Sequence, residues 1–430
     1  MEAVNSKKIT LKQILKDNWC PFLDAHHLLV PWYVAYNIWK VVNCREPDGL
    51  GYATFSCPVH PTEICHVPRT CKSRFCSICA KVQIDKWVTG MNQLFPNCSY
   101  FHITFTVPAQ FRTLLFEKRV LLNAVFSAST ETIISFCKEK GFLPAVTAVL
   151  HTFGSDLKRH VHIHCIVSAG GLKLTGKAER ITRYRKRKRN NPKAKKRKVA
   201  VKEDDPKWIA CHMFPYAMLR KRYQALLIEH LKNKIKDNLQ SSDPDQDLLV
   251  FSDSAVMKTF FDDLKQEYNN GFYVHVTEER QDLQMTAEYI GRYARRPPLS
   301  EVRIKKYNGE YVAFEYKDYR NNGSKVLYTL KTLEFIRKLI RHIPPHYFHV
   351  IRHYGILASR VKSKFKQITD KLLATPPAKE KSKNWEERQT IFTGINPLLC
   401  KICQRTMRFV SAYLPQPLAV IKKSLQITFP

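Results

Sequence analysis

The sequence predicts an α+β protein, in which an antiparallel sheet carries helices on one face and is preceded by a small helical domain rich in cysteine. Segment 99–107 alternates apolar and polar residues in the way typical of half-buried strands, the apolar run at 145–151 predicts a further strand, and segment 159–167 alternates like the first. A helical pattern at 111–140 separates the first two segments, whereas only the turn Gly154–Asp156 separates the last two. Strand, helix and hairpin in this order favour an antiparallel sheet covered by helices.

The composition is that of a folded protein with a polyanionic partner. The 430 residues are 44% hydrophobic and 11% aromatic, which is enough for two or three domains with cores. Lys and Arg number 71 against 37 Asp and Glu, so the net charge is +34 and nucleic acid is the first partner expected. No segment approaches 18 uninterrupted apolar residues, and the N-terminus lacks the apolar core of a secretory signal. We therefore expect a cytoplasmic protein with no membrane partner, whose 13 cysteines are mostly reduced.

Cysteine and histidine gather in one short stretch, whose members are Cys44, Cys57, His60, Cys65, His66, Cys71, Cys76 and Cys79. Cys57-x2-His60 and Cys76-x2-Cys79 have zinc-ribbon spacing, because a two-residue gap lets one tight turn aim both ligands at the same ion. We expect these four residues to bind a structural Zn²⁺. Cys44 and Cys71 are expected as further ligands, and Cys65 and His66 stay undecided. A second site, or thiols that fill apolar positions, would also account for the remaining residues.

The stretch Arg159–Val167 places imidazoles on one face of a strand. His160, His162 and His164 alternate with apolar residues, so they stand about 7 Å apart along one side. Such a row is a metal site that needs one more ligand, and the alternative for this stretch alone is a solvated strand face. In an antiparallel hairpin His151 lies near His162 across the ladder, which makes His151 a candidate third ligand.

Two tyrosines lie four residues apart in a predicted helix. Tyr289 and Tyr293 therefore face the same way, and Pro297 and Pro298 end the helix. If the helix packs across the histidine strand, both phenols reach one metal centre and can attack a phosphate held there. The alternative is a pair of half-buried helix aromatics. Three arginines in the same segment would neutralise phosphate, namely Arg292, Arg295 and Arg296.

A strongly basic insert follows Gly170-Gly171. Its charges repel one another until a polyanion binds, so we expect a loop that grips DNA. A solvated loop tip is the alternative. The residues concerned are Arg185, Lys186, Arg187, Lys188, Arg189, Lys195, Lys196, Arg197 and Lys198.

The remaining pattern is a mixture of helices and short strands. Helices are predicted within 9–42 and at 216–236, 254–268 and 333–341, and strands at 272–277, 302–307 and 311–316. Asn308-Gly309 joins the last two strands as a hairpin signal. The tail after about residue 363 is rich in lysine and contains Cys400-x2-Cys403, which is half of a zinc site or else two unrelated thiols.

In its cysteine cluster, its histidine strand and its two-tyrosine helix, the chain resembles the two-tyrosine rolling-circle transposases of bacterial insertion sequences, which are members of the HUH endonuclease superfamily. The resemblance covers about residues 10–360. Its motifs are TCKSRFCSIC at 70–79, FHITFT at 101–106, the segment 151–164 with Gly170-Gly171, AEYIGRY at 287–293 and IRHYG at 351–355.

The resemblance implies an HUH palm with His162 and His164 as metal ligands and Tyr289 and Tyr293 as nucleophiles. It implies nicking of single-stranded DNA at transposon ends through 5′-phosphotyrosine intermediates, transfer to target DNA, and rolling-circle transposition. Mg²⁺ or Mn²⁺ would be the catalytic metal and Zn²⁺ a structural one. The resemblance also implies that the protein is cytoplasmic and associates with the bacterial nucleoid. Two departures matter: His60 stands where the family more often has cysteine, and the insert is longer than expected.

The expected organisation has three parts. Residues 1–95 form the zinc-binding domain, 96–360 the catalytic domain with its basic insert at about 177–207, and 361–430 a basic tail. A rolling-circle replication initiator or relaxase is one alternative function, and a non-catalytic zinc DNA-binding protein is another. For the third metal ligand His275 and Glu288 remain candidates beside His151.

Overall fold

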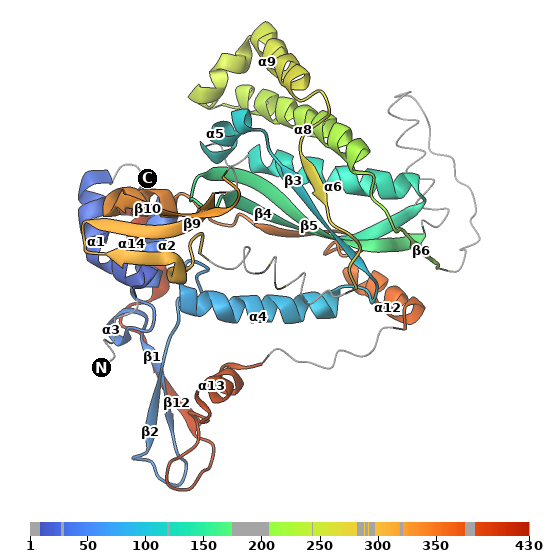
Figure 1. The fold of residues 1–430 in the computed structure, drawn as a ribbon. Helices are drawn as coiled ribbons and strands as arrows, with labels where there is room; N and C mark the ends of the chain where they lie inside the picture. Colours follow the sequence, from blue (N-terminus) through green and yellow to red (C-terminus); the bar gives the residue numbers. More distant parts are fainter. Residues whose placement is uncertain are drawn as a thin grey trace.

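The computed structural model describes residues 9–26, 30–117, 121–173, 206–242, 244–281, 288, 291, 297–318, 321–374 and 383–429. Figure 1 shows a sheet between two layers of helices, a helical domain at one end, and a long β-ribbon that projects from the body. No helix in the described part of the chain is long and apolar enough to cross a bilayer.

A six-stranded antiparallel sheet forms the centre of the protein. Its strand order is β11-β4-β5-β3-β7, and β6 pairs with the far end of β5. The strands are β3 (Tyr100–Thr106), β4 (Phe142–Phe153), β5 (Arg159–Lys173), β6 (Trp208–Ala210), β7 (Val274–Val276) and β11 (Ile351–Gly355). The alternation in the sequence divides the two faces, since Val161, Ile163 and Cys165 enter the main apolar core while the histidines of β5 face the other way.

Among the described elements, four α-helices and a 3₁₀ segment cover the apolar face of the sheet. They are α5 (Ala109–Glu117), α6 (Leu122–Glu139), α8 (Tyr216–Leu239), the 3₁₀ segment η3 (Gln246–Ser252) and α9 (Ser254–Glu267). Phe105 of β3 packs on the fully buried ring of Tyr223 in α8. The expected helix at 111–140 is divided into α5 and α6. The α+β class is confirmed.

The second face of the sheet is also covered, which the expectation of helices on one face did not include. Helix α4 (Ser77–Leu94) runs along it, as Figure 1 shows, and α12 (Lys362–Leu372) lies beside it. Trp87, Met91 and Phe95 pack against sheet residues such as Val149 and Ile166. Helix α4 therefore covers part of the histidine face of the sheet. A site on this face lies on the same side of the sheet as α4.

The N-terminal helices share a core with segments from later in the chain. Helices α1 (Leu11–His26), α2 (Trp32–Val42) and α3 (Pro47–Leu50) come first. The later segments are η4 (Glu301–Arg303), the sheet β8 (Ile304–Tyr307), β9 (Tyr311–Asp318) and β10 (Ser324–Lys331), and helix α11 (Thr332–Ile340). Side chains of β8, β9, β10 and α11 form one buried cluster with those of α1 and α2. The hairpin predicted at Asn308-Gly309 is present as β8 and β9, and Gly309 has the positive φ that such a turn requires.

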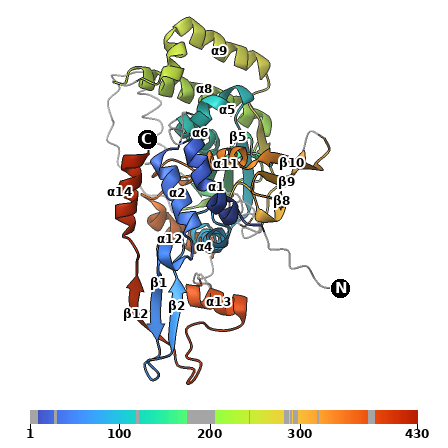
Figure 2. The same ribbon diagram turned by 90° about the vertical axis from the view of Figure 1, so that its left-hand side faces the viewer.

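The last residues return to the N-terminal domain. Strand β12 (Arg408–Tyr413) pairs with β1 (Tyr52–Ser56), which pairs with β2 (Ile64–Pro68), and α13 (Trp385–Thr393) lies beside this ribbon. Helix α14 (Leu418–Thr428) packs against α2. Both ribbon views show β1, β2 and β12 extending away from the body (Figure 2). Residues 383–429 are therefore folded against residues 30–68, although the sequence indicated a basic, polar tail with only half of a zinc site.

Candidate metal centres and nucleophile segment

Three imidazoles converge on the second face of the central sheet. The predicted hairpin brought His151 near His162, and in the structure His151 of β4 lies directly opposite His162 of β5. His164 follows two residues later on the same face. One ring nitrogen from each of the three lies within 4.8 Å of the others, and all three side chains are buried. Three imidazoles so close together fit one transition-metal ion.

Hydrogen bonds fix the orientation of these rings. His162 Nδ1 lies 3.0 Å from the carbonyl oxygen of His160, and His162 Nε2 lies 3.1 Å from His151 Nδ1. His164 Nδ1 lies 2.8 Å from His102 Nε2 and 3.1 Å from Thr104 Oγ1. Such neighbours hold metal ligands in a single orientation.

His102 is a site residue that the sequence did not reveal. It lies on β3, and β3 pairs with β5 so that Thr104 is opposite His164 and His102 is one position away on the same face. The alternation of segment 99–107 places His102 and Thr104 on one face, which is a usable signal. The missing information was that β3 is the neighbour of β5.

The environment keeps these histidines neutral. Burial lowers the pKa of His162 to about 3, and the charge of His160 adds to the effect. Burial lowers the pKa of His164 well below its usual value, with His162 and His102 contributing. Burial, followed by His275 and Arg280, lowers the pKa of His102 to about 4. A neutral imidazole is the form that binds a metal.

The other candidate ligands do not join this group. His160 lies at the start of β5, and its ring packs on that of His162. His275 is exposed on the edge strand β7, opposite Thr104. Glu288 is exposed as well, and neither it nor His275 belongs to the three-histidine group. Of the three candidates for the third ligand, the structure brings His151 to the pair.

The nucleophile segment is described only at Glu288 and Gly291, both of which are helical. Tyr289, Tyr293 and the predicted phosphate-binding residues Arg292, Arg295 and Arg296 lie outside the described residues. Gly291 lies midway between the two tyrosines in sequence. It is buried against α4, where a Cβ atom would meet Trp87 Cε3 at 2.9 Å and Ile84 Cγ2 at 3.4 Å. Helix α4, which covers the histidine face, thus also contacts the tyrosine segment.

The basic insert lies outside the described residues too. The residues concerned are Arg185, Lys186, Arg187, Lys188, Arg189, Lys195, Lys196, Arg197 and Lys198. Its position in the sequence, between β5 and β6, connects it to the end of the histidine strand that is far from His162.

Four cysteines form a group at the start of α4. Cys44 Sγ lies 3.7 Å from both Cys79 Sγ and Cys76 Sγ, and Cys71 Sγ lies 3.5 Å from Cys79 Sγ. In a tetrahedral site with Zn–S bonds of about 2.3 Å, sulfur atoms stand about 3.8 Å apart. Cys76 precedes the first residue of α4 and Cys79 lies in its first turn, so an ion here would fix the helix that crosses the histidine face.

The expected grouping of the cysteines is corrected in one respect. Cys57 and His60 do not share a site with Cys76 and Cys79, because the β1–β2 ribbon extends away from the start of α4. They meet Cys400 and Cys403 instead, some 340 residues later in the chain. The two-residue spacing identified Cys57/His60 and Cys76/Cys79 as ligand pairs, but it does not determine which pairs come together in the fold. Cys65 and His66 lie on β2 and belong to neither group.

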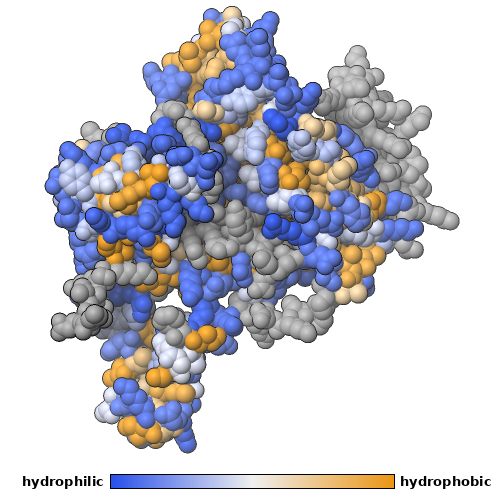
Figure 3. Space-filling model, viewed as in Figure 1, coloured by the Kyte–Doolittle hydropathy of each residue, from blue (hydrophilic) through white to orange (hydrophobic). Residues whose placement is uncertain are grey.

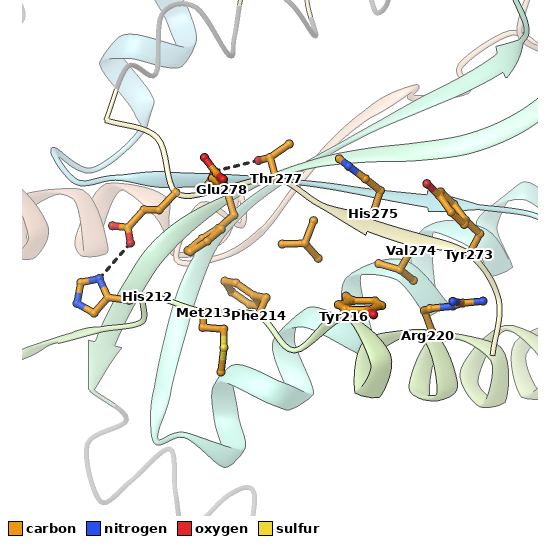
Figure 4. Close-up of a pocket in the computed structure, with 13 residues that line it drawn as sticks. His212, Met213, Phe214, Tyr216, Arg220, Tyr273, Val274, His275, Thr277 and Glu278 are labelled. Carbon is orange, nitrogen blue, oxygen red and sulfur yellow. Dashed lines mark hydrogen bonds and ion pairs between the residues drawn. The ribbon is translucent and has the colours of Figure 1, made fainter. Parts of the chain in front are cut away.

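A pocket of about 560 Å³ lies at the β7 edge of the sheet. Figure 4 shows Tyr216 and Arg220 of α8 on one side, and Tyr273 and His275 on the other. Tyr216 and Tyr273 are 60% and 55% exposed, although tyrosine usually buries its ring. Glu279 in the lining is paired with His212 at 3.0 Å. The pocket thus offers aromatic surfaces and a guanidinium at the edge of the sheet that carries His164.

Comparison with known proteins identifies the family. A family described as "Putative transposase" matches residues 145–364, which is just over half of the chain, and a "Transposase zinc-binding domain" matches residues 14–107. The chain belongs to this transposase family. The first match includes the histidine strand and both tyrosines, and the second includes Cys44, Cys71, Cys76 and Cys79.

Two relatives align over most of their length. The chain is 26% identical over 359 residues to the transposase for insertion sequence element IS801 of Pseudomonas savastanoi pv. phaseolicola, covering 83% of this chain and 77% of the relative. It is 26% identical over 348 residues to "Putative transposase y4qJ" of Sinorhizobium fredii, covering 78% and 79%. No solved structure matches significantly. The protein is therefore a transposase that acts on DNA, with an N-terminal zinc-binding domain.

Proposed function

We propose that this transposase nicks and rejoins single-stranded DNA at the ends of its element through 5′-phosphotyrosine intermediates, and so drives rolling-circle transposition. The observation that carries the proposal is the convergence of His151, His162 and His164 on the face of the sheet that α4 also covers. Gly291, between Tyr289 and Tyr293, is buried against the same helix. The helix that packs on the histidine face of the sheet thus also contacts the nucleophile segment at Gly291.

The three histidines would hold the catalytic Mn²⁺ or Mg²⁺. Their neutral imidazoles suit Mn²⁺ better than Mg²⁺, which prefers oxygen ligands. When bound, the ion would draw charge from the scissile phosphate as a Lewis acid. His102 and Thr104 would keep the ring of His164 in its ligating orientation. We expect cleavage to be faster with Mn²⁺ than with Mg²⁺ at equal, subsaturating concentrations.

Tyr289 and Tyr293 would supply the nucleophiles. The phenolic oxygen of one tyrosine attacks the phosphorus in line, a P–Oη bond forms, and the bond from phosphorus to the 3′ oxygen breaks. The phenolic proton is lost and the 3′ oxygen takes up a proton, so a phosphotyrosine at the DNA 5′ end and a free 3′ hydroxyl result. One ester replaces another, and a 3′ hydroxyl can therefore reverse the step on the same or on a different strand. Two tyrosines permit two such links in one subunit, which suits transfer from donor to target.

Cys44, Cys71, Cys76 and Cys79 would bind a structural Zn²⁺ at the start of α4. Because α4 spans the histidine face and contacts Gly291, that ion would set the position of the tyrosine segment relative to the metal. The role proposed for this zinc is alignment of the catalytic parts.

Basic and aromatic residues would hold the single strand. The insert around Arg187 and Lys196, together with Arg292, Arg295 and Arg296, would neutralise phosphates. Tyr216 and Tyr273 would stack on bases, and Arg220 lines the same pocket. The protein would act on the bacterial nucleoid in the cytoplasm.

The proposal is tested with a single-stranded oligonucleotide that carries an element end and a label at its 3′ end. The fragment on the 3′ side of the nick is the one that stays on the protein, so incubation with Mn²⁺ should transfer the label to protein on a denaturing gel. Tyr289→Phe with Tyr293→Phe should abolish this transfer while DNA binding persists. A label that moves to protein only from the 5′ end would mean the opposite polarity. Binding without any covalent product would favour a non-catalytic zinc DNA-binding protein.

A further inference from the structure

Four residues from opposite ends of the chain lie together at the far end of the projecting ribbon, just beyond the last residue of β1. They are Cys57, His60, Cys400 and Cys403, and one ligand atom of each lies within 4.8 Å of the others. Cys57 Sγ is 3.5 Å from Cys403 Sγ and 3.9 Å from His60 Nδ1, and Cys400 Sγ is 3.7 Å from His60 Nδ1. A tetrahedral zinc site with one nitrogen and three sulfur ligands has edges of about 3.5–3.8 Å. We propose that these residues form a second zinc site, which fastens the C-terminal segment to the N-terminal domain.

The backbone presents both ligand pairs in tight turns. The amide of Val59 donates a hydrogen bond to Cys57 Sγ at 3.4 Å, which stabilises a thiolate. In the second turn the amide of Gln404 donates to the carbonyl oxygen of Cys400 at 2.9 Å, and Gln404 adopts φ 58°. The amide of Cys400 donates to the carbonyl of Arg405, also at 2.9 Å. A tight turn at each pair is what zinc-binding pairs with a two-residue gap require.

The apolar packing around these residues is too small to hold them together. Among the described residues, the local cluster contains three buried members, Cys57, Cys400 and Met407, with Phe55, Cys65 and Cys403 partly buried against them. Every residue of β12 is exposed, including Phe409 and Val410, and Figure 3 shows apolar side chains on the surface of the ribbon. A three-stranded ribbon with so little core is marginal without a further cross-link, and none of the 13 cysteines forms a disulfide. A metal ion supplies that cross-link.

The ion would close the chain on itself. Beyond the site, β12 pairs along β1 from Ser56 to Tyr52, and α14 then packs on α2, with Lys422 Nζ 5.3 Å from the centroid of the Trp32 ring. The zinc-binding match ends at residue 107, so half of this second site lies outside it. The zinc-binding domain is thus completed only when the C-terminal segment from residue 383 onward has returned to it.

The zinc content of the full-length protein tests the inference. The measurement uses a His162→Ala/His164→Ala background, so that the histidine site does not contribute, and elemental analysis should find two zinc ions per chain. Adding Cys400→Ser and Cys403→Ser should leave one, while the matched control Cys65→Ser, on the same ribbon, should leave two. His60→Ala should leave one, whereas His60→Cys should keep two, because thiolate replaces imidazole.

A second measurement separates loss of the site from general unfolding. X-ray absorption at the zinc edge should give seven sulfur and one nitrogen neighbours for every two ions, and His60→Cys should raise this to eight sulfurs. In the Cys400→Ser/Cys403→Ser variant, proteolysis should release the segment after residue 383 while the remaining ion keeps four sulfur neighbours. One zinc in the parent, or two in the Cys400→Ser/Cys403→Ser variant, would overturn the inference.

Discussion

Replacing Gly291 with alanine probes the link between α4 and the nucleophile segment. The new Cβ would lie 2.9 Å from Trp87 Cε3 and 3.1 Å from Trp87 Cζ3, whereas carbon atoms in ordinary contact stand about 3.5–4.0 Å apart. Either Trp87 or the tyrosine segment must therefore move by roughly 0.5–1 Å. Trp87 is only 8% exposed and packs in the cluster between α4 and the sheet, so we expect much of the movement in the segment.

The change should affect the rate far more than the stability. Overpacking costs about 1–3 kcal/mol, and alanine in place of glycine in a helix returns about 1 kcal/mol. The net loss of stability is then roughly 0–2 kcal/mol. A displacement of about 1 Å at the reacting atoms can slow a reaction about 100-fold, which corresponds to about 2.7 kcal/mol in the barrier.

The assay is the single-turnover rate of covalent attachment to the 3′-labelled oligonucleotide, at saturating DNA and Mn²⁺. Gly90→Ala is the matched control, because Gly90 lies on α4 and its added Cβ would meet no atom within 4 Å beyond its chain neighbours and its own helix backbone. The rate of this variant should be unchanged. Gly291→Ala combined with Trp87→Leu should regain part of the lost rate, since the smaller side chain makes room. Wild-type attachment by Gly291→Ala would refute the idea that α4 positions the tyrosines.

The remaining predictions concern the metal and the DNA. His102→Ala should weaken Mn²⁺ binding about 10–100-fold, because His102 orients His164 without being a ligand, and excess Mn²⁺ should restore activity. A titration of the attachment rate with Mn²⁺ measures this effect. Loss of attachment at every Mn²⁺ concentration would make His102 a ligand. Replacing residues 183–198 by a neutral linker of equal length should reduce the slope of log K for DNA binding against log salt concentration. The reduction should be about 0.7 for each phosphate that the protein no longer neutralises. Filter binding measures the slope, and an unaltered slope would exclude the insert from DNA binding. Tyr273→Ala should weaken binding of single strands by about 1–3 kcal/mol, whereas Tyr311→Ala, on the distant β9, should not; equal effects in fluorescence anisotropy would remove the pocket from the DNA path.

The alternation of apolar and polar residues revealed much of the central sheet. It predicted the two strands that contain His102, His162 and His164, and the apolar run at 145–151 predicted the strand that contains His151. The short turn between β4 and β5 placed His151 near His162, and the structure pairs the two directly. These are local properties, because the period and the turn length are both set by residues close together in the sequence. The same patterns predicted α8, α9 and the β8–β9 hairpin.

Long-range pairing could not be predicted in this way. Nothing near Cys400 indicates that it meets Cys57, and two pairs with identical spacing are interchangeable until the fold separates them. The position of α4 on the histidine face depends on the packing of Trp87 and Met91 against Val149 and Ile166. No pattern in the nearby sequence specifies this long-range contact. The place of β8–β10 in the N-terminal core has the same origin.

The central claim is that a tyrosine in the segment beside α4 attacks DNA activated at the three-histidine site. The most direct measurement is mass spectrometry of the trapped protein–DNA product after digestion by nuclease and protease, which locates the modified residue. The account predicts a nucleotide 5′-phosphate esterified to Tyr289 or Tyr293, with none formed by the His162→Ala/His164→Ala variant at any Mn²⁺ concentration. Attachment at any other residue, or cleavage that leaves a free 5′ phosphate and no adduct, would contradict it.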